Sequence, residues 1–372
     1  MPAVPKPMVS ESLQAACDNA IRTARRGDTR SSVGLARHAY RLARQESQEA
    51  ELEALNAMAL CQGANGSHIE SIATSIDAFR LARQTGHRSG AAYALTTMAA
   101  GASFILDADK VVLDMLAVCR GEADALEDSV LLARVLNTLG LVYGNLQRFD
   151  EADREYDAGI QLVLNSAPRA GVVTPAYLMS GNKAFLAVLR AKSAPEVQRE
   201  SSQADAERRI EYVLAIANRE ANIDAQARAL FCLGQLRALQ GRYDESLTAF
   251  EDTLERANRI RHNPRLIDTY IEVSKLYAAQ EKYELALEAL EQAFEIADAN
   301  RPTNKVYVAC EGMEVMYRSV ARLREAAHYR AKTVRERESF IRENELAVRD
   351  LTAFWRTVAA GQASDQTLTV GA

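Results

Sequence analysis

The residue types that usually perform catalysis are scattered along this sequence. Its five histidines stand far apart, and the spacings that hold phosphate, zinc or a serine nucleophile are missing. The sequence contains no G-x-x-x-x-G-K-[ST], G-x-G-x-x-G, H-E-x-x-H or G-x-S-x-G segment. We therefore expect a chain that is not an enzyme, with no catalytic residues, no cofactor and no metal site.

The cysteines also indicate no reactive centre. They are odd in number and far apart, and none belongs to a C-x-x-C pair, so neither a disulfide framework nor a zinc site is indicated. We predict that all are buried in helices: Cys17, Cys61, Cys119, Cys232 and Cys310. The first residues lack the layout of a signal peptide, and no stretch has the ~20 apolar residues of a membrane span. We expect a reduced, soluble, cytoplasmic protein.

Composition indicates helices. The 372 residues are 48% hydrophobic and 26% charged, with only 8 prolines and 18 glycines, and alternating strand patterns are missing. The net charge of −5 argues against a dedicated nucleic-acid partner. A local excess of arginine between residues 22 and 44 could follow phosphates, but few aromatic residues accompany it, and a solvated cap or a contact with an acidic protein is the preferred interpretation.

A repeat of about 40 residues runs through the chain. Three turns align as QRFDEA (147–152), GRYDES (241–246) and EKYELA (281–286). A small residue before each turn extends into a register with intervals of 39, 41, 40, 41, 53, 40 and 40 residues. Its positions are Ala20, Ala59, Ala100, Gly140, Gly181, Gly234, Ser274 and Glu314. Glu314 breaks the small-residue rule, so we expect the last hairpin to pack differently from the rest. We attribute the long interval to a polar loop at 192–203, and we predict that His68 packs where other turns carry Phe or Tyr.

Small residues in this register have a physical meaning. Two antiparallel helices pack closely only if small side chains lie at the crossing and large ones fill the grooves beside it. A single hairpin cannot bury its own apolar face, so hairpins must stack and share a continuous core.

These positions resemble the tetratricopeptide repeat, over roughly residues 10–340. That motif places a large residue, Leu and Gly on the first helix and Ala, Phe and Ala on the second, as in Leu136, Leu139 and Gly140. The longer period is similar to that of bacterial signalling proteins: Rap-type regulators, MalT-type activators and arrays that precede diguanylate cyclase domains. The resemblance implies an all-α, right-handed solenoid of about eight hairpins.

In the tetratricopeptide family the first helices line a concave face that binds peptides. Carried over by position, the resemblance implies a set of amides, aromatic rings and cations on this face. Amides could pair with a peptide backbone, and cations with a carboxylate. The candidate partner-binding residues are Asn56, Phe104, Arg134, Asn137, Asn145, Asn182, Phe185, Arg228, Phe231, Gln235 and Lys275.

The predicted organisation has four parts. A disordered leader at 1–9 precedes the array at 10–323, a long helix at 324–358 and a flexible tail at 359–372. Along the long helix the residues that recur every seven positions are Ala327, Val334, Ile341, Val348 and Trp355. The helix is therefore either a dimerising coiled coil, with these residues as its seam, or a cap on the last hairpin. Its segment RENELAVRDLTAF resembles the junction before diguanylate cyclase domains, with a degenerate turn at 350–354.

The leading functional hypothesis is a non-catalytic scaffold or regulator that binds a protein or peptide in the concave groove. An alternative is the sensory input module of a signalling enzyme whose output domain is absent from this sequence. A third alternative is a subunit of a transcription or secretion complex. Protein or peptide partners are expected, with no membrane, and a homodimer through the long helix is left open.

Overall fold

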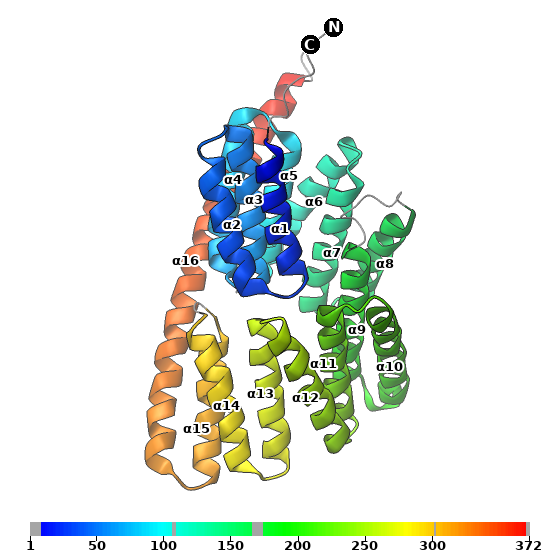
Figure 1. The fold of residues 1–372 in the computed structure, drawn as a ribbon, viewed down its shortest axis with the longest axis vertical. Coiled ribbons are helices and arrows are strands. Elements are labelled where there is room, and N and C mark those ends of the chain that lie inside the picture. The colour runs from blue at the N-terminus through cyan, green and yellow to red at the C-terminus, as the bar shows by residue number, and fades with distance from the viewer. Residues whose placement is uncertain (1–8, 106–108, 166–173, 301–302, 370–372) are drawn as a thin grey trace.

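The computed structural model describes residues 9–105, 109–165, 174–300 and 303–369, so nearly all of the predicted leader lies outside the described residues. The described residues form sixteen helices that pair in chain order into eight hairpins (Figure 1). This confirms the predicted all-α solenoid. None of these helices combines the length and the apolarity needed to cross a membrane.

The first eight helices are α1 (Glu11–Arg25), α2 (Thr29–Ala43), α3 (Gln48–Ala64), α4 (His68–Thr85), α5 (Arg88–Ala102), α6 (Asp109–Ala125), α7 (Ser129–Asn145) and α8 (Phe149–Asn165). The next eight are α9 (Thr174–Ser193), α10 (Glu196–Arg219), α11 (Ile223–Leu239), α12 (Tyr243–Arg259), α13 (Asn263–Ala279), α14 (Tyr283–Asp298), α15 (Lys305–Ser319) and α16 (Leu323–Thr369).

Two glycines of the register, Gly140 and Gly234, lie where the two helices of their hairpins cross, whereas Gly181 faces Arg228 of α11. A Cβ atom added to Gly140 would lie 2.5 Å from the ring of Tyr156, and one added to Gly234 would lie 2.5 Å from the ring of Phe250. The aromatic rings thus occupy the space that a larger side chain would fill. All five cysteines are buried, as predicted, and burial raises the pKa of Cys61 to about 11.

The fifth hairpin differs from its prediction. No polar loop fills 192–203, because α9 continues to Ser193 and α10 begins at Glu196. The inserted residues lengthen both helices instead: α10 has 24 residues, whereas α8 and α12 have 17 each. Six residues of the inserted segment, KSAPEVQRESSQ, are Lys, Glu, Gln or Arg, which favour helix, and this outweighed the polarity of the segment.

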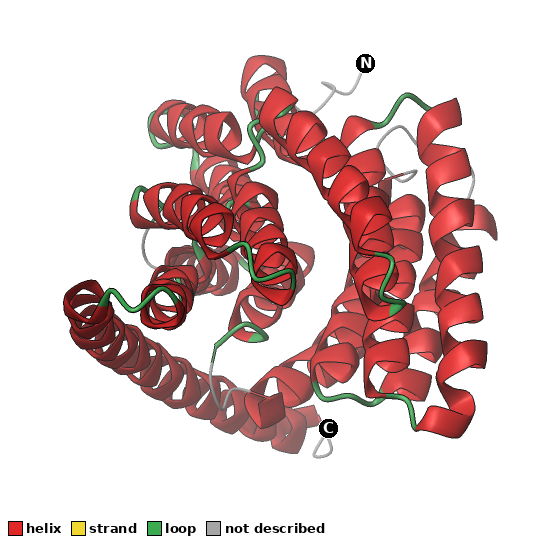
Figure 2. Ribbon diagram, turned by 90° about the horizontal axis from the view of Figure 1, so that it is seen from below, coloured by secondary structure: helices red, strands yellow, loops and turns green. Residues whose placement is uncertain are grey.

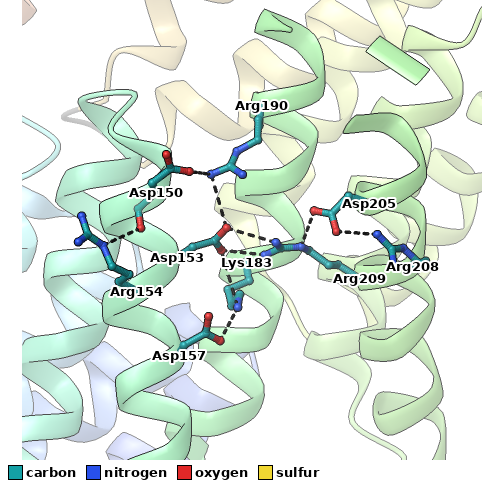
Figure 3. Close-up of polar contacts among 9 residues, drawn as sticks. All are labelled: Asp150, Asp153, Arg154, Asp157, Lys183, Arg190, Asp205, Arg208 and Arg209. Atoms are coloured by element: carbon teal, nitrogen blue, oxygen red, sulfur yellow. Dashed lines mark hydrogen bonds and ion pairs between the residues drawn. The ribbon is translucent and has the colours of Figure 1, made fainter. Parts of the chain in front are cut away.

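An ion-pair network joins the fourth and fifth hairpins (Figure 3). Its centre is Asp153 on α8, whose carboxylate accepts from Arg209 of α10 at 2.7 and 3.2 Å. Arg190 and Lys183 of α9 lie within 3.5 and 3.8 Å of the same carboxylate. Asp153 is only 18% exposed, so these contacts are shielded from solvent and hold three helices in one arrangement.

The first helices of the hairpins form a continuous inner layer. Each contacts its own hairpin partner and also the first helix of the next hairpin, from α1 to α15. The chain winds round until the early hairpins lie above the sixth to eighth ones (Figure 1). A Cβ added to Gly66 would lie 3.7 Å from Pro264, and one added to Gly27 would lie 2.2 Å from Ile260. The solenoid therefore closes on itself.

Helix α16 completes this closure. It pairs with α15 at its start and then runs back to pack against α4 and α6, so that it crosses from the last hairpin to the second and third ones (Figures 1 and 2). Leu351 is fully buried there and Trp355 is 8% exposed, within the largest apolar cluster of the protein. The ring of Phe354 meets that of Phe79 edge-on at 5.4 Å.

This helix is longer than its prediction. It reaches Thr369, so most of the predicted tail is helical, and the predicted turn at 350–354 lies inside the helix. The apolar residues of the expected coiled-coil seam lie in two different environments. Val334 is 51% exposed, whereas Val348 and Trp355 pack within their own chain. This half of α16 covers the second and third hairpins, not the last one on which a cap was predicted.

The helix crossing at Gly234 can be tested by one methyl group. We expect Gly234→Ala to lower the free energy of unfolding by about 1–3 kcal/mol, because the new Cβ overlaps the Phe250 ring. Gly121→Ala is the matched control: it lies within α6 with nothing within 4 Å, and we expect it to stabilise the helix by up to about 1 kcal/mol. Urea unfolding followed by circular dichroism measures both. Equal midpoints for the two variants would contradict the crossing.

The docking of α16 can be tested with two leucines of the same helix. Leu351→Ala should cost about 2–5 kcal/mol, since it leaves a cavity in the cluster under α16. Leu346→Ala should change stability by less than about 0.5 kcal/mol, because Leu346 is 49% exposed. Limited proteolysis should cut α16 faster in the Leu351 variant only. Cleavage at the same rate in both variants would show that this end of α16 is not docked.

Candidate functional site

Two adjoining hollows, both partly open to solvent, lie between the early and late hairpins of the solenoid. The first hollow, of about 340 Å³, is walled by the ends of α1 and α3 and by α5, α7, α9 and α11. The second hollow, of about 390 Å³, lies between the α3–α4 turn and α11, α13 and α16. They share part of their lining, which is Gly63, Ala64, His68, Phe104, Arg228 and His262. We call the two together the inner cavity.

A stacked pair of rings stands between the two hollows. The ring of His68 lies 4.2 Å from that of Phe104, nearly parallel, and Phe104 is 50% exposed. His68 begins α4 just as Phe149, Tyr243 and Tyr283 begin α8, α12 and α14, so the predicted packing position is confirmed. Burial lowers the pKa of His68 to about 4, so its imidazole is neutral at pH 7.

A carboxylate and a second histidine face these rings from the late hairpins. Asp224 of α11 lies 3.6 Å from Arg228 and 3.7 Å from Nε2 of His262. His262 caps α13, because its Nδ1 accepts from the backbone N–H of Arg265 at 3.1 Å. Burial lowers the pKa of His262 to about 4, although Asp224 opposes the shift.

Four of the eleven candidate residues line the inner cavity: Phe104, Arg134, Asn137 and Arg228. Arg134 donates to Oγ1 of Thr97 at 2.9 Å and lies over the ring of Tyr93 at 5.1 Å. Asn137 accepts at Oδ1 from Nδ2 of Asn182 at 3.0 Å. These residues bring one amide, one ring and two guanidinium groups to a common space.

Three candidate amides instead join neighbouring helices outside the lining. Asn56 donates to the carbonyl of Gly90 at 3.4 Å, and Asn145 donates to the carbonyl of Ser103 at 3.1 Å. Asn182 is engaged with Asn137, as described. Their amides connect the repeats, because each reaches a group on the adjacent hairpin.

The remaining candidates also lie away from the cavity wall. Phe231 is 4% exposed in the apolar core, and Phe185 is 38% exposed but borders neither hollow. Gln235 has a buried side-chain oxygen with no partner among the described residues. Lys275 pairs with Glu272 at 2.7 Å.

The sequence reasoning missed much of the lining. His262, Asp224 and Arg265 lie near the starts of first helices, well before the register positions used for the groove. They meet His68 only because the solenoid closes, and no local pattern indicates that closure. Arg25 belongs to the arginines between residues 22 and 44 for which a solvated cap is the preferred interpretation, yet it borders the first hollow.

A separate cleft of about 940 Å³ lies on the other side of α16, between that helix and α4, α5 and α6. Its wall holds charges of both signs, among them Arg80, Arg83, Glu122 and Asp350. Within the described residues, no group of three His, Cys, Asp or Glu side chains is placed to hold a metal ion.

The neutral histidines make stability depend on pH. Their folded pKa lies below the unfolded value, so the unfolded chain binds protons that the folded chain does not, and stability is lost as pH falls from about 6.5 toward the folded pKa of about 4. Each histidine contributes a slope of up to about 1.4 kcal/mol per pH unit. His68→Phe preserves the stacking and should flatten the dependence between about pH 6.5 and pH 5. Urea midpoints that fall equally in both proteins would contradict this.

Two segments match models of the tetratricopeptide repeat, residues 133–162 and residues 225–299. A search among curated proteins found no match. Solved structures share the fold. A Rap protein in complex with Competence and Sporulation Factor is 12% identical, covering 95% of this chain and 99% of its own, with a TM-score of 0.54.

Two further solved structures show the same fold. A signal transduction ATPase with numerous domains from Pyrococcus horikoshii, which has a tetratricopeptide repeat sensor, is 13% identical, over 90% of this chain and 54% of its own, with a TM-score of 0.52. Aspartyl phosphate phosphatase F from Bacillus subtilis is 10% identical, over 95% of this chain and 96% of its own, with a TM-score of 0.50. The matched segments are tetratricopeptide repeats, and the chain as a whole is a tetratricopeptide-like helical solenoid with the architecture of Rap proteins.

Proposed function

We propose that this chain is a non-catalytic regulator or scaffold of cytoplasmic signalling that binds a short peptide segment of its partner in the inner cavity. The observation that carries the proposal is the pair of adjoining hollows, about 340 and 390 Å³, that lie between the early and late hairpins. Volumes of this order suit a ligand of a few residues.

The chemistry of the wall supports a peptide. Apolar surface comes from Phe104, Leu178 and Ile267, while the side-chain NH2 group of Asn137 can donate to a backbone carbonyl. A peptide whose side chains fill apolar pockets and whose amides meet such groups gains both affinity and orientation. Five buried free cysteines agree with a reducing compartment.

The position of α16 supports a regulatory role. Phe340 and Asn344 of this helix line the second hollow, and its later part packs against α4 and α6. A ligand in the cavity would touch early hairpins, late hairpins and α16 at once. Binding would therefore favour one relative placement of these parts over others, which is the requirement for a switch.

A cavity-filling substitution tests the proposal. Ala64 borders both hollows, so Ala64→Trp should occupy the space where they join. The purified chain is incubated with a library of random short peptides, separated by size exclusion, and the retained peptides are identified by mass spectrometry. We expect retention by the wild type and at least about a tenfold decrease in the variant, equivalent to ~1.4 kcal/mol or more.

The matched control is Ala125→Trp, at an exposed position of α6 that borders neither hollow. It should retain peptides as the wild type does, and thermal melts should show that both variants are folded. Undiminished retention by a folded Ala64→Trp variant would exclude the inner cavity as the site. No retention by the wild type would overturn the peptide proposal itself.

A further inference from the structure

The lining of the inner cavity has a charge opposite to that of the protein. The chain carries −5 overall, yet its two hollows are bordered by five cationic side chains and only two carboxylates. The cations are Arg25, Arg134, Arg228, Arg265 and Lys305, and the carboxylates are those of Asp224 and Asp268. Such a concentration of one sign within low-dielectric walls attracts ligands of the other sign.

The two carboxylates are already engaged. Asp268 pairs with Lys305 at 2.8 Å, and Asp224 lies between Arg228 and His262. Arg265 instead lies over the ring of Phe231 at 4.6 Å. Within the described part of the chain, its Nε finds no hydrogen-bond acceptor. Positive charge in the second hollow is therefore only partly compensated.

Unpartnered hydrogen-bond donors mark the same place. Nε of Arg228, Nε of Arg265 and Nδ2 of Asn344 are buried, line the second hollow and lack an acceptor among the described residues. Asn344 is only 2% exposed. Two further unpartnered polar atoms, Oδ1 of Asn65 and Nδ1 of His68, also lie in this wall. A buried donor without a partner costs free energy, so an occupant with acceptor oxygens would relieve that cost.

The arginines also act on one another. The pKa of Arg265 is lowered, first by burial and then by the neighbouring charge of Arg228. The pKa of Arg134 on the facing wall is likewise lowered by burial, with Arg25 adding to the effect. Guanidinium groups remain charged at pH 7 despite such shifts, so Arg228 and Arg265 repel each other in the folded chain.

We infer that the second hollow binds a carboxylate of a short acidic peptide, held by the donors of Arg228, Arg265 and Asn344. The carboxylate is either an Asp or Glu side chain or the peptide's own C-terminus. The inference rests on the proposed function, which it deepens by specifying the charge of the ligand. Apolar neighbours such as Ile69, Ile267 and Phe340 suit the adjoining side chains of a peptide.

Three peptide libraries test the carboxylate. One is random with a free C-terminus, one is random with an amidated C-terminus, and one is amidated and lacks Asp and Glu. The full chain is incubated with each, and retained peptides are identified after size exclusion. We expect at least tenfold enrichment of peptides that carry a carboxylate. Equal retention from the first two libraries would identify an Asp or Glu side chain, and loss of retention in the amidated library would identify the C-terminus.

Substitutions then locate the contact. Arg265→Gln and Arg228→Gln should each abolish the enrichment, while peptides without a carboxylate are retained as before. Arg259→Gln is the control, an exposed cation on α12 that borders neither hollow, and it should keep the enrichment. Thermal melts identify any variant that does not fold, and for such a variant the libraries are repeated with Asn344→Leu, which removes the third donor.

The outcomes separate the two proposals. Retention of peptides without preference for a carboxylate, unchanged by the arginine substitutions, would overturn the carboxylate and leave the peptide site standing. No retention from any library would overturn both. Inorganic phosphate could instead stabilise the wild type thermally, with the effect lost in Arg265→Gln and absent with acidic peptides. That result would overturn the carboxylate and identify a phosphate as the ligand of the second hollow.

Discussion

The hairpins of this protein depend on two helices that come close at a small residue, as at Gly140 and Gly234. There the partner helix places an aromatic ring where a side chain would stand, so the two helices approach closely at these positions. Because the crossing recurs about every 40 residues, each hairpin adds a similar rotation to the stack. The accumulated rotation returns the chain to its own beginning, and the inner cavity results from that return.

The cavity holds charges that a structural core would not contain. Burial and the neighbouring charge of Arg228 both lower the pKa of Arg265, so the folded chain disfavours the charged form of Arg265. Asp224 offsets part of this cost, and the ring of Phe231 under Arg265 offsets more. Groups that are costly in the absence of a ligand and face a cavity are typical of binding sites.

The sequence predicted the architecture well and the site only in part. Small residues at the crossings and aromatic residues in the turns are local features, so the hairpins could be identified from neighbours along the chain. Asn137 and Arg228 were found because they lie on the inner face of first helices. His262 and Arg265 were not found, because they lie more than 150 residues after His68 in the sequence. They reach the cavity only through contacts between distant hairpins. The length of α10 was missed because a polar helix and a polar loop share a composition.

Helix α16 couples the last hairpin of the array to its second and third hairpins. An open solenoid interacts only with nearest neighbours, so its terminal units fray and unfolding spreads inward from either end. With 47 residues at a rise of 1.5 Å each, α16 is roughly 70 Å long and joins the last unit to the second and third. The array thereby loses one free end. Fraying of the final hairpin would also expose the cluster around Trp355, so distant repeats share a single cooperative transition.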